Sequence, residues 1–270
     1  MRILLVSDIH ANRAALDAIP LDSFDACLCM GDLVEYGPDP EESLAWVRKY
    51  ANYSVRGNHD HGAAQNVEVH GVSGFRYLTM TTRKMTVERL GTGDRRFLAD
   101  LPVSTMVTVG GFRFLLVHAS PRDPLDEYVP TDAKSWADRT EGLAVDFVCV
   151  GHTHTQFSID TGGPRVVNPG SIGLQRDGNP NGRYAIIEDG RVQLKEVPYD
   201  INRTLAAVER ARLDPLTKTM LGDVYRLGRY VHPDGLGTKS GVVTTSPRTP
   251  VRDSPPPHES GMMRRPVGVT

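Results

Sequence analysis

Short apolar runs that end in polar clusters recur along the first part of the chain. Residues 2–6, 26–30 and 53–56 are such runs, and their length and polar boundaries predict strands. Between them, residues 12–19 and 40–50 carry apolar side chains at helical spacing, and the second segment opens on a proline followed by two acidic residues, as helices often do. This alternation of strands and helices predicts an α/β fold with some parallel strand pairing.

The pattern continues with helical and hairpin signals as far as residue 230. Residues 65–101 are mostly helical in pattern, with breaks at glycines, whereas residues 102–109 and 112–117 flank a Gly-Gly pair and predict a hairpin. Residues 144–150 are another apolar run. Four short strands and two amphipathic helices are then expected, the strands at residues 157–159, 165–168, 183–188 and 191–197 and the helices at residues 201–212 and 216–230.

The character of the sequence changes after Leu236. Residues 237–270 contain no aromatic side chain and are rich in Pro, Ser, Thr, Gly and Arg, including three consecutive prolines at 255–257. Such a segment cannot bury enough apolar surface to offset the entropy lost on ordering. We therefore predict a folded domain over residues 1–236 and a disordered tail over residues 237–270.

The composition excludes several classes of protein. The 31 Lys and Arg residues nearly balance the 33 Asp and Glu residues, which leaves no basic surplus for tight binding of duplex nucleic acid. No apolar run approaches the ~18 residues of a membrane helix, and the apolar start of the chain turns polar at Ser7 and Asp8, too early for a signal peptide. Cys27, Cys29 and Cys149 lie in apolar runs and are expected to be reduced core thiols of a cytoplasmic protein.

Histidine, aspartate and asparagine side chains follow the predicted strands. Ligands of α/β proteins bind outside the carboxyl ends of the strands, so residues far apart in sequence can meet there. Carboxylate oxygens and neutral imidazoles together suit Mn, Fe, Zn and Co, and one carboxylate can bridge two ions ~3.5–4 Å apart. The residues concerned are Asp8, His10, Asp32, Asn58, His59, His118, His152 and His154.

Taken singly, these motifs are weak. The spacing of Asp8 and His10 occurs by chance, and a lone His118 after a strand is more often a core or surface histidine than a ligand. The pair His152 and His154 is more specific, because two histidines share one face directly after an apolar strand. The occurrence of all the motifs in this order along one chain is what favours a two-metal hydrolytic site.

In this order the motifs resemble the five signature blocks of the calcineurin-like metallophosphoesterases. The blocks are Asp8-Ile9-His10, Gly31-Asp32, Gly57-Asn58-His59-Asp60, His118 and Gly151-His152-Thr153-His154. Two further runs are similar to motifs of the small bacterial phosphodiesterase branch, Asn168-Pro169-Gly170-Ser171 and Val197-Pro198-Tyr199-Asp200. The resemblance covers about residues 1–230, and every metal-binding block is complete.

The resemblance implies a four-layer αββα sandwich, in which two mixed β-sheets pack face to face between helices. It also implies two divalent ions per chain, with Mn favoured among Mn, Fe, Zn, Co and Ni. One ion would be held by Asp8, His10, Asp32 and His154, and the other by Asp32, Asn58, His118 and His152, so that Asp32 is shared. His59 would donate a proton or hydrogen bond to the phosphoester, and the adjacent Asp60 would orient it.

Together, these expectations predict that the protein is a metal-dependent phosphodiesterase. It would hydrolyse small phosphoesters, such as nucleotides or cyclic nucleotides, by attack of a metal-bridging hydroxide. The alternative enzyme is a phosphomonoesterase or protein phosphatase, and the non-enzyme alternative is a metal-free binding scaffold. A small phosphoester is the expected partner. No membrane partner and no tightly bound duplex is expected, and an oligomer remains open.

Three further residues are candidates for contact with the substrate. Arg56 directly precedes the block that contains Asn58, although a solvated cation at a strand edge explains it equally well. Arg122 follows His118 and would be placed to clamp a phosphate. Tyr36 is expected to form part of the wall of the pocket.

Overall fold

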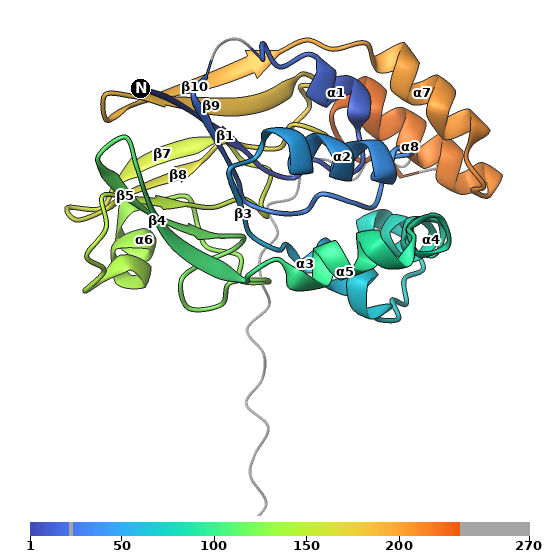
Figure 1. Ribbon diagram of the computed structural model, residues 1–270. Coiled ribbons are helices and arrows are strands. Elements are labelled where there is room, and N and C mark those ends of the chain that lie inside the picture. Colours follow the sequence, from blue (N-terminus) through green and yellow to red (C-terminus); the bar gives the residue numbers. More distant parts are fainter. Residues whose placement is uncertain (22–23, 233–270) are drawn as a thin grey trace, which may run out of the picture. The chain divides into compact units, whose positions relative to one another are not determined.

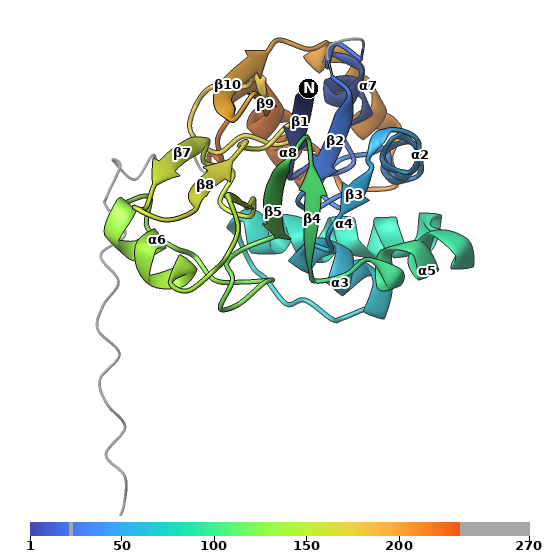
Figure 2. The same cartoon turned by 60° about the vertical axis from the view of Figure 1, so that its left-hand side comes forward.

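Two β-sheets form the centre of the fold (Figures 1 and 2). This computed structural model describes residues 1–21 and 24–232. Within those ranges, one five-stranded sheet has the order β10-β9-β1-β2-β3 and the other the order β4-β5-β6-β8-β7. The strands are β1 Arg2–Val6, β2 Ala26–Cys29, β3 Tyr53–Ser54, β4 Ser104–Val109, β5 Phe112–Val117, β6 Phe147–Cys149, β7 Phe157–Asp160, β8 Arg165–Asn168, β9 Gly182–Glu188 and β10 Arg191–Val197.

Both sheets are mixed, as predicted. In the first, β1 and β2 run parallel, as do β2 and β3, whereas β9 runs antiparallel to both β1 and β10. In the second, β6 runs parallel to both β5 and β8, and the outer strands β4 and β7 are antiparallel to their neighbours. The parallel strands of each sheet therefore bring several carboxyl ends to one edge.

Short polar residues fix the ends of several helices. Asn12, Asp200 and Asp214 accept hydrogen bonds from backbone N–H groups in the first turns of α1, α7 and α8, which satisfies donors that a helix cannot pair internally. The helices in the described ranges are α1 Arg13–Asp17, α2 Pro40–Tyr50, α3 Asn58–Gln65, α4 Gly74–Arg89, α5 Thr92–Asp100, α6 Ala133–Thr140, α7 Ile201–Arg210 and α8 Pro215–Leu227.

The alternation of side chains along the strands builds the layers. Leu4 of β1 packs in an apolar cluster with residues of α1 and α2. Its neighbours Ile3 and Leu5 point to the other face and pack with Phe114 of β5, so this second cluster lies between the two sheets. A third cluster covers the far face of the second sheet with Trp136 of α6. The result is the four-layer sandwich that the family resemblance implies.

Two helices differ from the expectations drawn from sequence. The strand predicted at residues 53–56 ends at Ser54, and the polar block that follows opens α3 at Asn58. The α6 helix is not predicted, because Trp136 is its one buried apolar side chain and gives no periodic signal. The first difference matters for the site, because it places three of the predicted residues, Asn58, His59 and Asp60, on one rigid element.

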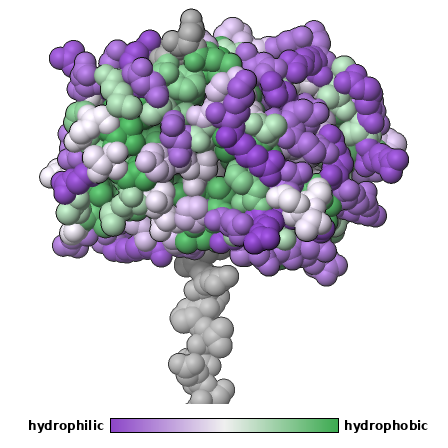
Figure 3. All heavy atoms as spheres, viewed as in Figure 1, coloured by the Kyte–Doolittle hydropathy of each residue, from purple (hydrophilic) through white to green (hydrophobic). Residues whose placement is uncertain are grey.

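The surface combines hydrophilic and hydrophobic side chains. On the face shown in Figure 3, hydrophilic side chains are spread over the helices, with hydrophobic residues between them. Cys27, Cys29 and Cys149 are buried free thiols, as predicted. In the described part of the chain, no helix combines the length and apolarity needed to cross a membrane. The predicted tail over residues 237–270 lies outside the described residues.

Candidate metal centre

Six buried side chains form two clusters at the carboxyl ends of four strands. Strands of both sheets contribute, namely β1 with Asp8 and His10, β2 with Asp32, β5 with His118, and β6 with His152 and His154. Within each cluster the donor atoms lie within 4.8 Å of one another, and the clusters are Asp8, His10 and His154, and Asp32, His118 and His152. The fold therefore brings together six of the seven predicted metal ligands, because the carboxyl ends of the strands that precede them meet at one edge.

Asp32, a member of the second cluster, also lies close to the first. Its Oδ2 is 3.2 Å from Nε2 of His118 and 3.7 Å from Nε2 of His10. In the first cluster, His154 Nε2 is 3.4 Å from Asp8 Oδ1 and 3.1 Å from His10 Nε2. One carboxylate oxygen is thus close to imidazoles of both clusters, which is the geometry of a ligand shared by two ions.

Backbone carbonyls fix the tautomers of three of these imidazoles. The Nδ1 atoms of His10, His118 and His154 donate to buried carbonyl oxygens at 3.2, 2.6 and 2.5 Å, respectively. A carbonyl only accepts, so in the neutral ring the proton sits on Nδ1 and the lone pair on Nε2. Metal-binding histidines commonly make this second contact. The rings are therefore oriented with their ligand atoms toward the centre.

Burial keeps three of the four imidazole rings neutral, whereas a neighbouring carboxylate favours the protonated form of the fourth. Burial lowers the pKa of His10 and His154 well below the usual value and that of His152 to about 3, which keeps these rings neutral. For His118, burial also opposes protonation, but the Asp32 carboxylate raises the pKa to about 9. The protonated His118 ring therefore shares a proton with Asp32 through its Nε2 atom. A metal ion bound by these two residues would displace that proton.

Buried polar atoms without a partner and backbone strain at the same residues also indicate a site for metal ions. Among the described residues, Asp8 Oδ2 and His152 Nε2 are buried without a hydrogen-bond partner, which is rare for polar atoms. A non-glycine residue at positive φ costs on the order of 1–3 kcal/mol and is found mainly at functional sites. The φ angles are 45° to 65° at Asp8, His10, Asp32, His152 and His154. The donor set and its geometry therefore fit two divalent cations.

Asn58, the seventh predicted ligand, reaches the second cluster from α3. Its Oδ1 lies 3.2 Å from Nε2 of His118. Gly57 permits this approach, because a Cβ atom at that position would overlap the carboxylate and backbone nitrogen of Asp32. The backbone N–H of His59 in turn donates to Asp32 Oδ1 at 3.0 Å. The first turn of α3 is therefore fixed directly against the carboxylate at the centre.

His59 contacts a carboxylate that the sequence interpretation missed. Its Nδ1 lies 2.6 Å from Oε2 of Glu35, which is fully buried, and its Nε2 lies 3.9 Å from Oδ2 of Asp32. Arg83 of α4 holds Glu35 through Nε at 2.5 Å and Nη2 at 3.2 Å. Although burial opposes protonation, the Asp32 and Glu35 carboxylates raise the pKa of His59 above its usual value. Arg83, Glu35 and His59 thus form a buried line that ends at the candidate metal centre.

The expected orienting role of Asp60 is wrong. Its carboxylate accepts hydrogen bonds from the backbone N–H groups of Leu33 at 2.8 Å and Gly57 at 2.9 Å, while Glu35 contacts the His59 ring. Asp60 is the third residue of α3, where a carboxylate caps the helix. Burial and the charge of Asp32 raise its pKa to about 7. Asp60 therefore fixes α3 to the Asp32 loop rather than orienting the imidazole.

The three candidate substrate contacts have different surroundings. The buried Tyr36 ring packs edge-on against His10 at 4.7 Å and lies 4.9 Å from the His59 ring, so it borders the candidate metal centre. Arg56 instead donates to the carbonyl of Ala99 at the end of α5, at 3.1 Å. Arg122 is half exposed and pairs with Asp138 of α6 at 3.0 Å. Both guanidinium groups therefore have structural partners outside the two clusters.

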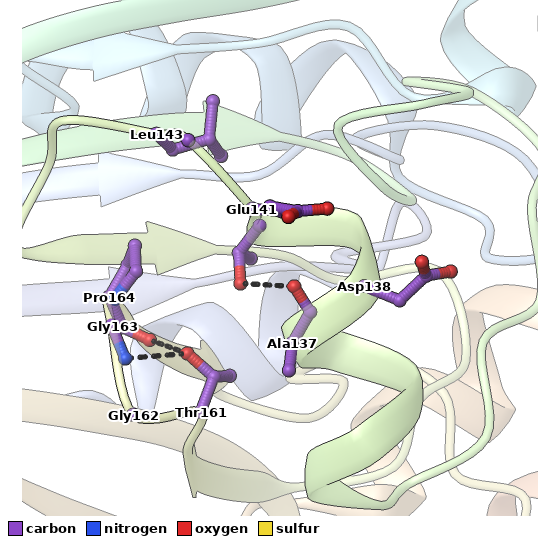
Figure 4. A pocket seen from close by; sticks show the side chains of 10 residues that line it. Ala137, Asp138, Glu141, Leu143, Thr161, Gly162, Gly163 and Pro164 are labelled. Carbon is purple, nitrogen blue, oxygen red and sulfur yellow. Dashed lines mark hydrogen bonds between the residues drawn. The ribbon is translucent and has the colours of Figure 1, made fainter.

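A separate cavity of about 460 Å³ lies between α6 and the turn that joins β7 and β8 (Figure 4). Thr161 shapes this turn by donating to the carbonyl of Pro164 at 2.7 Å and accepting from the N–H of Gly163 at 3.3 Å. Asp138 and Glu141 supply the carboxylates of the lining. None of the predicted site residues lines this cavity, so it is distinct from the candidate metal centre.

Comparison with known proteins agrees with this geometry. A model of the calcineurin-like phosphoesterase superfamily domain matches residues 1–189. An uncharacterized protein from Methanocaldococcus jannaschii is 29% identical over 249 residues, which cover 84% of this chain and 98% of that protein.

Solved structures show the same similarity. The crystal structure of a metallophosphoesterase from Sphaerobacter thermophilus is 31% identical with a TM-score of 0.71, covering 84% of this chain and 99% of that one. A protein from Pyrococcus horikoshii OT3 shares the fold with a TM-score of 0.70 and 22% identity, over 82% of this chain and 97% of its own. The matched model, the related metallophosphoesterase and the paired clusters agree, and the chain belongs to the calcineurin-like phosphoesterase superfamily.

Proposed function

We propose that this protein is a dinuclear metal-dependent phosphodiesterase that hydrolyses small phosphoesters, with nucleotides or cyclic nucleotides as the favoured class. The observation that carries the proposal is the position of Asp32, in one of two buried clusters of histidine and aspartate, close to the other and beside His59. Membership of the superfamily supports phosphoester hydrolysis, and the paired clusters support a site for two ions.

The proposed ligands divide between two ions that share Asp32. Asn58 would complete the set through its Oδ1, which already faces His118. When bound, two divalent ions neutralise the charge of the phosphoryl oxygens and lower the pKa of a coordinated water. The first ion would be bound by Asp8, His10, Asp32 and His154, and the second by Asp32, Asn58, His118 and His152.

His59 is the proposed proton donor to the leaving oxygen. Because its Nδ1 contacts Glu35, the proton available for transfer is the one on Nε2, which faces Asp32 and the centre. The Asp32 and Glu35 carboxylates stabilise the protonated ring against its burial, and Arg83 holds Glu35 in place. Proton transfer by a positioned side chain typically contributes ~10²–10⁴-fold to a rate.

Removal and return of metal test the proposed function. We expect dialysis against a chelator to abolish hydrolysis of bis-p-nitrophenyl phosphate and added Mn²⁺ to restore it, with about two ions bound per chain as counted by elemental analysis. Mn²⁺ is the favoured metal, and parallel reconstitution with Fe, Zn, Co and Ni would rank the alternatives. A protein that binds no metal and hydrolyses nothing would instead be a binding scaffold.

Paired aryl substrates separate the two enzyme alternatives. A phosphodiesterase is expected to hydrolyse bis-p-nitrophenyl phosphate with a higher kcat/KM than p-nitrophenyl phosphate. The opposite ratio would identify a phosphomonoesterase, and turnover of phosphopeptides would identify a protein phosphatase. Cyclic nucleotides and mononucleotides belong in the same screen, because they are the physiological class that we favour.

Replacing Glu35 with glutamine is expected to move the pH profile. Glu35 is one of the two carboxylates that raise the pKa of His59, so its loss lowers that pKa. A proton donor is lost as pH rises through its pKa, and kcat of Glu35→Gln should therefore decline at a lower pH than kcat of the wild type. Steady-state kinetics across pH at saturating metal, with a nucleoside 2′,3′-cyclic phosphate whose leaving alkoxide needs a proton, measure the shift.

The matched control is Glu41→Gln, which removes a carboxylate of α2 that is also paired with an arginine, Arg89, but lies on the surface. Its pH profile should match that of the wild type. An unchanged profile in Glu35→Gln would mean that His59 is not the titrating donor.

The proposed setting follows from the cysteines and the charge. Cys27, Cys29 and Cys149 are free thiols, which supports a reducing, cytoplasmic compartment. The balanced charge of the chain supports a small phosphoester rather than a tightly bound duplex as the partner. The oligomeric state is open.

A further inference from the structure

Arg176 is a cation held by aromatic side chains rather than by a carboxylate. It lies in the loop between β8 and β9, and the carbon of its guanidinium stands 4.6 Å from the ring centre of Phe75 on α4. Although burial opposes its charge, the neighbouring Tyr36 and Tyr128 hydroxyls raise the pKa of Arg176. Its Nε is buried without a hydrogen-bond partner in the described part of the chain. No ion pair within residues 1–21 and 24–232 joins Arg176 to an acidic side chain, unlike Arg83 with Glu35 or Arg139 with Glu127.

The two aromatic residues beside Arg176, Tyr128 and Phe75, are connected by ring contacts to the candidate metal centre. The Tyr128 ring lies 4.2 Å from the ring of His152, in the second cluster. The Phe75 ring lies 5.9 Å from that of Tyr36, which packs against both His10 and His59. Arg176 therefore contacts Phe75, which packs against Tyr36 at the wall of the centre, and neighbours Tyr128, which packs against His152 of the second cluster.

The charge of Arg176 reaches the first cluster. Burial lowers the pKa of His154 well below its usual value, and the positive charge of Arg176 is the next cause. Burial raises the pKa of Asp8 to about 6, and the same guanidinium is one of the groups that oppose this rise. The position of the guanidinium itself comes from its contact with Phe75, whose ring lies 5.9 Å from that of Tyr36 at the wall of the centre.

A guanidinium in this position is suited to an anion that arrives with the substrate. A cation whose Nε is buried and that has no carboxylate partner is costly, and two divalent ions beside it would add positive charge. The planar guanidinium matches two phosphoryl oxygens and forms stronger hydrogen bonds with them than neutral donors do. The orphaned Nε leaves a donor for this purpose.

We propose that Arg176 is a substrate-binding residue whose guanidinium hydrogen-bonds non-bridging phosphoryl oxygens of the phosphoester at the candidate metal centre, with Phe75 and Tyr128 as positioning residues. The inference rests on the proposed function and assigns a protein cation to that site. Arg56 and Arg122, the arginines predicted from sequence, differ because each guanidinium already binds a group of the protein elsewhere.

The test is a phosphate titration of the Mn²⁺-loaded protein. We expect the dissociation constant of inorganic phosphate, measured by calorimetry, to rise about 10- to 100-fold in Arg176→Ala, the loss expected for a charge-assisted contact. The KM for bis-p-nitrophenyl phosphate should rise as well. Arg176→Lys should give an intermediate loss, because lysine keeps the charge but not the planar fork.

The matched control is Arg165→Ala, which removes an arginine of β8 that pairs with Asp160 at 3.0 Å. It should leave phosphate affinity and KM unchanged. Elemental analysis checks that each variant binds as much metal as the wild type. If Arg176→Ala loses metal, Arg176→Gln takes its place, and unchanged phosphate affinity in either metal-loaded variant would overturn the assignment.

The titration needs no turnover, so it separates this inference from the proposed function. A wild type that binds metal and phosphate but hydrolyses no phosphoester would contradict the function and leave the comparison of Arg176 variants valid. A wild type that hydrolyses the diester, together with an Arg176→Ala variant of unchanged phosphate affinity, would contradict the Arg176 assignment alone.

Discussion

Replacing Asp32 with asparagine is expected to abolish hydrolysis and to remove bound metal. Asp32 Oδ2 lies 3.2 Å from His118 Nε2 and 3.7 Å from His10 Nε2, so one substitution withdraws a charged ligand from both proposed ions. Changing groups that only hydrogen-bond metal ligands costs 10–100-fold in affinity, so the loss of a shared ligand should exceed about 100-fold. We expect kcat to fall by at least about 10³-fold, because charge stabilisation by the ions is lost with them.

Elemental analysis after dialysis and hydrolysis of bis-p-nitrophenyl phosphate measure the two effects. Asp100→Asn is the control, because it removes an exposed carboxylate of α5 that faces Arg96 at 3.6 Å, on the surface. That variant should keep about two ions and wild-type kcat. An Asp32→Asn protein that retains both ions and full activity would exclude a shared ligand at this position.

The two metal clusters could be predicted from the sequence because each ligand is recognised by its position directly after a predicted strand. Each ligand follows an apolar run that has the length and boundaries of a strand, and parallel strands bring their carboxyl ends together whatever their separation in sequence. Asp8, Asp32 and His118 could therefore be assigned to one place without knowing any distance between them. The same reasoning predicts an α/β fold with some parallel strand pairing, which the structure has, whereas the two mixed sheets are what the family resemblance implies.

Glu35, Arg83 and Arg176 could not be found in this way. Glu35 is an acidic residue in an apolar stretch directly after the Gly31-Asp32 block, which is a signal of burial but not of its partner. Arg83 contacts Glu35 from α4, 48 positions later in the sequence. No sequence pattern indicates which of the arginines of α4 makes this contact. Arg176 depends on two aromatic residues from separate loops and helices.

The Asp60 prediction failed for a geometric reason. Adjacent residues of a helix point about 100° apart, so neighbours in sequence do not face each other. With α3 beginning at Asn58, His59 faces the centre and Asp60 caps the helix. The carboxylate that reaches the imidazole comes instead from the loop after β2, where Glu35 has a φ of 71°.

Replacing His59 with asparagine is expected to slow hydrolysis in proportion to the leaving group's need for a proton. For a nucleoside 2′,3′-cyclic phosphate, which releases a sugar alkoxide, we expect kcat to fall about 10²–10⁴-fold, the usual contribution of a general acid. For bis-p-nitrophenyl phosphate the loss should be much smaller, because p-nitrophenolate leaves without protonation. The ratio of the two losses isolates the role of the His59 proton.

Metal content distinguishes this variant from Asp32→Asn. The His59 ring approaches Asp32 only at 3.9 Å and is not among the proposed ligands, so His59→Asn should retain about two ions per chain. His70→Asn, which replaces an exposed histidine near Glu68, is the control and should leave both substrates unaffected. Equal losses on the two substrates would contradict proton donation, because a purely structural role of His59, or stabilisation of the non-bridging phosphoryl oxygens, does not depend on the leaving group.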